Sequence, residues 1–270
     1  MRSPQRIRAR PPAPKQAPAA PALNIRKREL WIKGVRFPLE AYAFEKQIGK
    51  GANAAVFKTG SLLLKRIEAV KIYLPKPGDK RDKLKQGAFE SQKQAAAAFQ
   101  NDRFHVINIF HAGILNGYFY TTMEFFDGPN LKTWVKTASL VDKWRMAHLY
   151  NDAMNFTSMP TLFHGDPHMG NILVGKDDIA ICDYGTSHFT SRAYGWKRHW
   201  GIVDKVMTAL LSDFESFTHY RKQWPDKTPG MIFAAYRDVL RALTTELFDK
   251  TDGTPDEVPA HMKGTWQYQL

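Results

Sequence analysis

The sequence is poor in cysteine and has no long hydrophobic run, and both absences restrict the class of protein. Its 270 residues contain one cysteine, Cys182. No disulfide can therefore form within the chain, and we expect a reducing compartment for the folded protein. No apolar run reaches the roughly 20 residues of a membrane-spanning helix, so we expect a fold without transmembrane segments, suited to the cytosol. Hydrophobic residues make up 43% of the chain, which is enough for one folded domain with a sizeable core.

Acidic residues are almost absent from the first 36 residues. This segment has ten Lys or Arg and one acid, Glu29, and so carries +9 of the net charge of +13. Six prolines stand among its first 23 residues. Such a composition buries too little apolar area to offset the entropy of ordering the chain. We therefore predict that residues 1–36 form a disordered basic tail.

The composition of this tail leaves several interpretations open. It lacks the hydrophobic stretch of a secretory signal peptide. Its arginines suit a mitochondrial presequence, but its prolines oppose the amphipathic helix that a presequence needs, so this is the weaker alternative. The others are an unstructured signal for a specialised bacterial secretion system and a basic linker that binds acidic surfaces weakly. We predict no specific nucleic-acid binding.

Polar residues with a spacing suited to phosphoryl transfer lie between residues 164 and 185. Residues 164–171 read HGDPHMGN, and residues 183–185 read DYG. Phosphoryl transfer requires an acceptor hydroxyl held in line and Mg²⁺ ions that neutralise the phosphates. Asp166 is the candidate carboxylate for the hydroxyl, while Asn171 and Asp183 offer the hard oxygen ligands that Mg²⁺ prefers. The loop resembles that of the protein-kinase-like superfamily, in the form used by UbiB-type atypical kinases, lipopolysaccharide kinases and aminoglycoside phosphotransferases.

The resemblance continues upstream in a glycine-rich segment. Residues 48–56 read IGKGANAAV, which is similar to the loop whose backbone amides approach the phosphates of ATP. Ala54 replaces the third glycine of the family pattern. Two glycines by themselves usually indicate a turn. The segment therefore supports the resemblance only together with the residues that follow it.

A lysine and a glutamate follow in the order that the resemblance implies. Lys71 would contact the α- and β-phosphates, and Glu90, in a helix-like run, would form the ion pair with Lys71 that catalysis requires. Lys65 remains a rival for the phosphate lysine. Glu68 and Asp102 remain rivals for the glutamate.

A further segment, TMEFFDG at residues 122–128, resembles the hinge of a kinase. Met123 would flank the back of the adenine pocket, and the backbones of Glu124 and Phe126 would bond the adenine edge. Val56, Ala69 and Leu173 would enclose the ring, although all three are equally explained as core residues. The resemblance thus assigns nucleotide binding to Gly49, Gly51, Ala52, Asn53, Val56, Ala69, Lys71, Met123, Glu124, Phe126 and Leu173.

The fold implied is α+β: a two-lobed protein-kinase-like fold with an antiparallel N-lobe sheet and one helix. Strand-like alternation and an Asn116-Gly117 turn place this N-lobe at residues 37–126. A reduced, mainly helical C-lobe would occupy residues 127–250, and residues 251–270 would form a C-terminal tail.

Within the C-lobe, the sequence predicts helices after Ser139 and after Thr228-Pro229. Residues 191–199 are expected to form a basic, aromatic loop. The central helix is expected to begin at Asp204, whose carboxylate would bond the backbone of the catalytic loop.

The implied activity is that of an ATP- and Mg²⁺-dependent Ser/Thr protein kinase, with Mn²⁺ as an alternative metal. The short C-lobe and the absence of an A-P-E motif resemble minimal kinases that bacteria deliver into host cells as virulence effectors, so the protein substrate would be a host protein. Gly165 stands where many protein kinases have an Arg that docks a phosphorylated loop, so we expect activity without such phosphorylation.

Two other functions and one requirement stay open. The chain would alternatively be a small-molecule or lipid-linked kinase. A third interpretation is a nucleotide-binding scaffold, or a transferase of another part of ATP. The sequence also leaves open whether an activating partner orders the small C-lobe.

Overall fold

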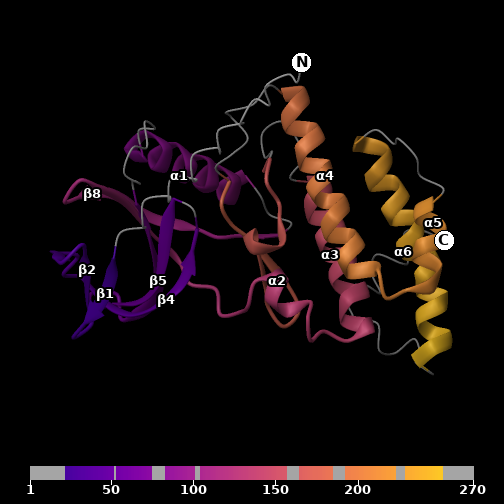
Figure 1. Cartoon of the computed structure of the whole chain (residues 1–270), viewed down its shortest axis with the longest axis horizontal. Coiled ribbons are helices and arrows are strands. Elements are labelled where there is room, and N and C mark those ends of the chain that lie inside the picture. Colours follow the sequence, from indigo (N-terminus) through magenta and orange to yellow (C-terminus); the bar gives the residue numbers. More distant parts are fainter. Residues whose placement is uncertain are drawn as a thin grey trace, which may run out of the picture.

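The computed structural model describes residues 22–51, 53–74, 83–100, 104–156, 164–184, 192–222 and 229–251. Strands dominate the first half of the chain and helices the second (Figure 1). This arrangement confirms the predicted α+β class. Within the described stretches, no helix has the length and hydrophobicity needed to span a bilayer.

The main sheet is antiparallel and has five strands in the order β4-β5-β6-β9-β8. Its strands are β4 (Tyr42–Lys50), β5 (Ala54–Ser61), β6 (Arg66–Tyr73), β8 (Ile109–Leu115) and β9 (Tyr118–Glu124). Asn116 and Gly117 both have positive φ, at 50° and 74°, so the predicted hairpin turn between β8 and β9 is confirmed. The sheet forms one side of the molecule in Figure 1, with α1 (Lys83–Gln100) along it.

A second, small sheet precedes the main one. It contains β1 (Leu23–Arg26), β2 (Glu29–Ile32) and β3 (Val35–Phe37), joined by tight turns. Leu30, Ile32 and Phe37 are buried in the same apolar cluster as Phe44 and Phe57 of the main sheet. The small sheet is therefore part of the core of this half.

These strands correct the prediction of a disordered tail over residues 1–36. Residues 23–36 are largely strand and turn, while residues 1–21 lie outside the described residues. The apolar alternation of residues 23–37 was concealed by basic residues at exposed positions. Both turns were also hard to recognise, because Lys27, Arg28 and Lys33 adopt the positive φ that usually marks Gly or Asn.

The second half joins a small sheet to a group of helices. The sheet has the order β10-β11-β7 and comprises β7 (His105–Val106), β10 (Ile172–Val174) and β11 (Ile179–Ile181). The helical elements are α2 (Leu131–Trp134), α3 (Leu140–Phe156), η1 (Met169–Asn171), α4 (Arg192–Leu211), α5 (Glu215–Lys222) and α6 (Pro229–Thr251). Helix α3 starts as predicted, because the Ser139 hydroxyl accepts a hydrogen bond from the Asp142 backbone at 3.1 Å.

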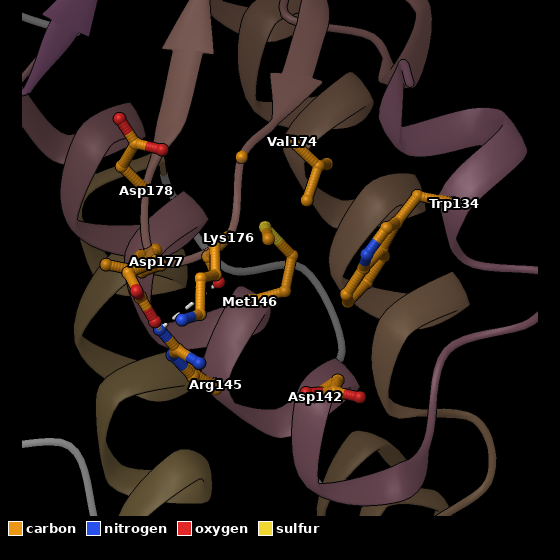
Figure 2. Close-up of a pocket in the computed structure, with 10 residues that line it drawn as sticks. Trp134, Asp142, Arg145, Met146, Val174, Lys176, Asp177 and Asp178 are labelled. Atoms are coloured by element: carbon orange, nitrogen blue, oxygen red, sulfur yellow. Dashed lines mark hydrogen bonds and ion pairs between the residues drawn. The ribbon is translucent and has the colours of Figure 1, made fainter. Parts of the chain in front are cut away.

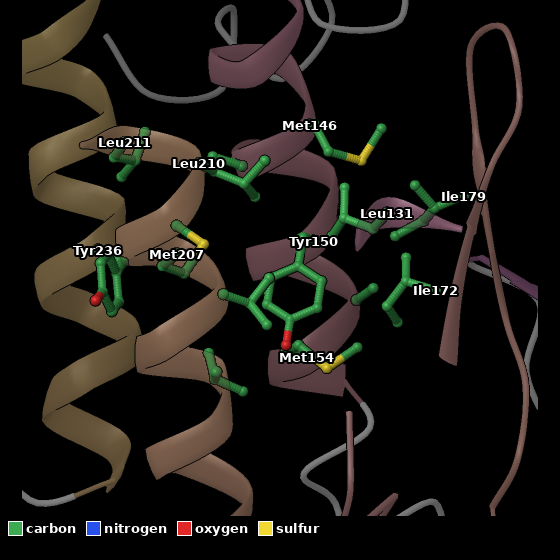
Figure 3. Close-up of a cluster of buried hydrophobic side chains, with 14 of the residues drawn as sticks. Leu131, Met146, Tyr150, Met154, Ile172, Ile179, Met207, Leu210, Leu211 and Tyr236 are labelled. Carbon is green, nitrogen blue, oxygen red and sulfur yellow. The ribbon is translucent and has the colours of Figure 1, made fainter. Parts of the chain in front are cut away.

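The core of this half lies between α3, α4, α6 and the β10–β11 hairpin. Figure 3 shows Tyr150 and Met154 of α3 between Met207 of α4 and Ile172 of β10. The Tyr150 hydroxyl also donates to the Pro167 carbonyl at 2.7 Å. Helix α3 thus supports the segment that carries the HGDPHMGN motif.

Helix α4 corrects two predictions. It begins at Arg192, so the predicted loop at residues 191–199 is wrong over its described part, and Asp204 is not at a helix start. Burial of Trp200, Val203 and Met207 along one face offsets the low helix propensity of the glycines in this stretch.

Asp204 does not reach the catalytic loop through the bonds that the structure describes. Its carboxylate accepts hydrogen bonds from Arg221 of α5 at 2.5 Å and from the Tyr236 hydroxyl of α6 at 2.7 Å. It therefore links three helices of the second half.

Candidate active site

Three ionisable side chains far apart in the sequence meet between the two halves of the fold. The Lys71 Nζ atom of β6 lies 2.8 Å from Asp183 Oδ1 and 3.5 Å from Glu90 Oε2 of α1. The Lys71 and Glu90 side chains are 15% and 10% exposed. Asp183, just after β11, is 44% exposed, so this cluster opens to solvent on the Asp183 side.

The charges of this cluster stabilise one another. Burial alone would lower the pKa of Lys71, but Asp183, Tyr73 and Glu90 together raise that pKa well above its ordinary value. The Lys71 ammonium in turn holds the pKa of Asp183 below its ordinary value, against the effect of burial. Lys71 and Asp183 are thus both charged at neutral pH.

Two neighbours fix the Glu90 carboxylate. The Tyr73 hydroxyl donates to Glu90 Oε2 and the Gln86 amide donates to Oε1, each at 2.8 Å. Tyr73 lies two residues after Lys71 on β6, so its side chain points to the same face of the sheet. Both contacts escaped the sequence analysis, although Gln86 stands one helical turn before Glu90.

The rival residues lie elsewhere. The carboxylate of Glu68 accepts bonds from Arg66 at 2.7 Å and from the Tyr42 hydroxyl at 3.0 Å. Lys65 lies in the turn between β5 and β6 with a φ of 50°. Asp102 falls outside the described residues.

Gln94 joins α1 to the segment of Asp183. Its amide nitrogen donates to the Ile107 carbonyl at 2.8 Å, and its amide oxygen accepts from the Asp183 N–H at 2.9 Å. Gln94 is 5% exposed. The sequence analysis missed it, although its place four residues after Glu90 puts both on one helix face.

Asp183 has a φ of 69°, in the left-handed region that residues other than glycine seldom adopt. Such a conformation persists where surrounding contacts fix it, and it is frequent at functional sites. The bonds from Lys71 and to Gln94 are the contacts that fix it here. Gly185 of the DYG motif lies outside the described residues.

The segment carrying Asp166 is fixed by its own side chains. The Nε2 atom of His164 lies 3.0 Å from the carbonyl oxygen of Cys182. The Nδ1 atom of the same ring accepts a hydrogen bond from the Asp166 N–H at 3.3 Å. Burial lowers the pKa of His164, which keeps the ring neutral. The Asn171 amide nitrogen donates to the Asp166 carbonyl at 3.0 Å.

The remaining polar groups of this segment have structural partners. His168 caps η1, because its Nδ1 atom accepts from the Gly170 N–H at 3.0 Å. His168 thus serves as a helix cap in this segment. Burial raises the pKa of Cys182 to about 12, so its thiol stays protonated and is a poor nucleophile.

The Asp166 carboxylate has a partner that the sequence did not predict. Arg198 of α4 places a terminal guanidinium nitrogen 3.0 Å from Asp166 Oδ2. Asp166 is 17% exposed and Arg198 39% exposed. This pair could not be predicted, because Arg198 falls in the stretch that was expected to be a loop.

The residues predicted to bind metal have suitable chemistry. The Cys182 N–H donates to the Asn171 carbonyl at 3.0 Å, so the backbones that carry Asn171 and Asp183 are adjacent. Among the described residues, no cluster of three or more His, Cys, Asp or Glu side chains could hold a metal by itself. A site with one amide and one carboxylate fits Mg²⁺, which commonly takes one or two carboxylates and completes its shell with phosphate oxygens and water.

The glycine-rich segment forms the hairpin between β4 and β5. A Cβ atom on Gly49 would lie 3.4 Å from Val56 Cβ. The Gly51 N–H donates to the Ala54 carbonyl at 2.8 Å, and the Asn53 carbonyl accepts from Leu74 at 2.8 Å. Ala52 lies outside the described residues.

Five of the residues predicted to surround adenine gather in one apolar cluster. Ala69 and Met123 are buried there, with Val56, Phe126 and Leu173 packed against them. The cluster joins the main sheet to the β10–β11 hairpin, which is where the resemblance places the base.

Glu124, in the predicted hinge, is more constrained than expected. Its N–H donates to the carbonyl of Asn108, the residue before β8, at 2.9 Å, so this amide already has a backbone partner. Burial would raise the pKa of its carboxyl, but hydrogen bonds from His105 and Asn108 outweigh burial and hold that pKa below its ordinary value.

A separate cavity of about 190 Å³ lies between α3 and the β10–β11 turn. Figure 2 shows Trp134 and Met146 on its walls, with Arg145 and Asp177 paired beside it. None of the predicted site residues lines it. It is also smaller than the roughly 300 Å³ of typical ligand pockets, so we do not identify it with the site.

Comparisons with known proteins give a sequence relative and distant structural likenesses. No family model matches the chain. Over 148 residues it is 28% identical to a protein of Clostridium acetobutylicum named as a probable serine/threonine-protein kinase. That match covers 53% of this chain and 22% of the relative, so the chain spans about a fifth of the relative's length.

The solved structures that are similar to this chain share little sequence with it. They include a mutant of the Mycobacterium tuberculosis PknI kinase domain, with 16% identity, a TM-score of 0.44 and coverage of 56% of this chain and 62% of that one. The apo form of PpkA-294 has 17% identity, a TM-score of 0.45 and coverage of 63% and 64%.

Proposed function

We propose that this protein is an ATP- and Mg²⁺-dependent phosphotransferase of the protein-kinase-like type that transfers the γ-phosphate to Ser or Thr hydroxyls of a protein. The observation that carries this proposal is the meeting of Lys71 with Glu90 and Asp183, which come from three separate segments. The name of the Clostridium relative supports the same activity.

The roles proposed for the residues follow from their charges. Lys71 binds the phosphates of the nucleotide, and Glu90 holds Lys71 in place. Asn171 and Asp183 hold Mg²⁺, which would neutralise the negative charge that accumulates on the transferred group. Asp166 accepts the hydrogen bond of the acceptor hydroxyl, orients its oxygen toward the γ-phosphorus and takes up the proton as the new O–P bond forms. The bond between the γ-phosphorus and the β–γ bridging oxygen breaks in the same step, and ADP leaves.

The nucleotide base would contact the apolar cluster of Val56, Ala69, Met123 and Leu173. Because the Glu124 N–H is bonded to Asn108, the Glu124 carbonyl and the Phe126 N–H are the backbone groups that we propose for the adenine edge. The glycine-rich segment, from Gly49 and Gly51 through Ala52 to Asn53, would cover the phosphates.

We propose residues 37–126 and 127–250 as the two lobes, with the β1–β3 sheet added to the first. Gly165 has a φ of 79°, a conformation that a side chain at this position would oppose. An Arg next to Asp166, of the kind that docks a phosphorylated loop, is therefore disfavoured, and we propose that activity does not require such phosphorylation. We also propose that the protein is exported as an effector and acts on a host protein.

An incubation of the purified protein with γ-labelled ATP, Mg²⁺ and a cell lysate tests the acceptor class. We expect label in protein bands, on phosphoserine or phosphothreonine after acid hydrolysis, and loss of label on chelation of the metal. Label confined to small molecules would favour a small-molecule or lipid-linked kinase. Absence of label in both fractions, with Mn²⁺ as well as with Mg²⁺, would contradict phosphotransfer.

A further inference from the structure

The ion pair between Asp166 and Arg198 has no place in the sequence pattern from which the site was predicted. Asp166 Oδ2 lies 3.0 Å from the guanidinium, and Arg198 comes from α4, 32 positions further along the chain. Among the described residues, no other cation forms a salt bridge with this carboxylate.

The ion pair affects the two carboxylate oxygens of Asp166 differently, because the guanidinium lies beside Oδ2. A carboxylate that orients an acceptor hydroxyl must present one oxygen to it in a fixed direction, because a misplacement of about 1 Å costs about 100-fold in rate. The His164 ring and the Asn171 side-chain amide bond the backbone of Asp166, and neither of these bonds reaches its carboxylate. The guanidinium that holds Oδ2 is thus the side-chain contact that fixes the rotation of the carboxylate.

The element that carries Arg198 is itself well anchored. The next two residues, His199 and Trp200, are 0% and 2% exposed, and α4 packs against α3, whose Tyr150 bonds the Pro167 carbonyl. Arg198 and Asp166 are therefore attached to one rigid unit. A planar guanidinium on such a support is better suited to hold an oxygen in place than a lysine on a loop.

Among the described residues, no other cation of the site is placed to do this. Lys71 is engaged by Asp183 and Glu90, and the position before Asp166 is a glycine in the left-handed region. On the proposed function, on which this inference rests, we propose that Arg198 is a positioning residue that fixes the Asp166 carboxylate for the acceptor hydroxyl. Helix α4 then supplies to the site a cation that the catalytic loop itself lacks.

Replacement of Arg198 with Ala tests the proposal, with Lys197→Ala as the matched control. Lys197 is an exposed cation on the same helix, so both changes remove one positive charge from α4. Steady-state rates would be measured with dephosphorylated casein, or with the labelled lysate protein if casein takes no label. ATP affinity would be measured with a fluorescent ATP analogue, and folding by thermal unfolding.

We expect Arg198→Ala to lower kcat about 100-fold, with the affinity for the ATP analogue and the melting temperature close to those of the wild type. Lys197→Ala should keep the wild-type kcat. A kcat of Arg198→Ala near or above the wild-type value would overturn the proposal. Equal losses of rate, nucleotide affinity and melting temperature would overturn it too, since they indicate a structural role alone. If the wild type itself transfers no label, that result contradicts the proposed function rather than the role of Arg198 alone.

Discussion

Among single residues, Lys71 and Lys65 differ most clearly in their surroundings. Lys71 is buried between two carboxylates, whereas Lys65 lies in a turn whose neighbours Leu63 and Leu64 are 79% and 59% exposed. The sequence favoured Lys71 from strand alternation and from the spacing to Glu90. Tyr73 and Gln94 share a strand or helix face with Lys71 and Glu90, but that spacing alone does not show which polar side chains will bond the charged cluster.

Replacement of Lys71 with Met therefore provides a sharp contrast with Lys65→Met. The Lys71 change removes the cation beside Asp183 and the proposed phosphate contact, so label transfer should fall about 100-fold or more. Lys65→Met should keep transfer within about twofold of the wild type, since exposed substitutions away from a site have small effects. Transfer rates with γ-labelled ATP check both, and the reverse order of the two effects would show that Lys65 is the phosphate lysine.

Helix α1 depends on one glycine for its distance from the main sheet. A Cβ atom on Gly87 would lie 2.4 Å from the Phe119 ring, and Phe119 itself packs edge-on against Tyr73 at 5.5 Å between ring centroids. The same helix carries Glu90 and Gln94. Close approach at Gly87 thus sets the position of the side chains that reach Lys71 and Asp183.

Gly87→Ala should therefore displace α1 and weaken the site. We expect a loss of about 1 to 3 kcal/mol in the free energy of unfolding, as for other overpacked cores, together with slower transfer. Gly201→Ala in α4 is the control, because nothing lies within 4 Å of its Cβ position and alanine favours a helix by up to about 1 kcal/mol. Urea unfolding measures both variants, and a Gly87→Ala protein as stable as the wild type would refute the close approach.

The helices and strands were predictable to different degrees. The β10–β11 hairpin, the Asn116-Gly117 turn and the Ser139 start of α3 all follow from local turn and capping chemistry. Helix α4 does not, because its first turns gain their stability from burial of Trp200 against distant helices rather than from local propensity. The ion pair of Arg198 with Asp166 depends on that helix and so could not be inferred.

For the whole molecule, the division into a sheet-rich and a helical half was predictable from periodicity, whereas the β1–β3 sheet was not. The apolar residues of this sheet alternate with arginines and lysines. The high charge of the segment therefore led to a prediction of disorder, although the alternation is typical of strands. The stability of the molecule also depends on a partly buried histidine, His148. Burial lowers the pKa of His148 to about 4, where its ring packs 4.7 Å from that of Trp144.

This lowered pKa predicts how the stability of the whole fold varies with pH. Below about pH 6.5 the unfolded chain protonates His148 while the folded protein does not, so the free energy of unfolding falls from pH 7 towards pH 4. His148→Phe keeps the aromatic contact and removes the titration. The loss of stability between pH 7 and pH 5 should therefore shrink by roughly 1 to 2 kcal/mol in this variant. Urea unfolding at the two pH values tests this, and an unchanged pH dependence would refute it.

The measurement that tests the central claim most directly is single-turnover transfer from γ-labelled ATP by Asp166→Asn and Asp183→Asn variants. The account predicts that both variants fold, and that each loses transfer by at least about 100-fold. Asp183→Asn should in addition lose the Mg²⁺ dependence of nucleotide binding. Transfer at the wild-type rate by either variant would contradict the claim that these two carboxylates act in one site with Lys71.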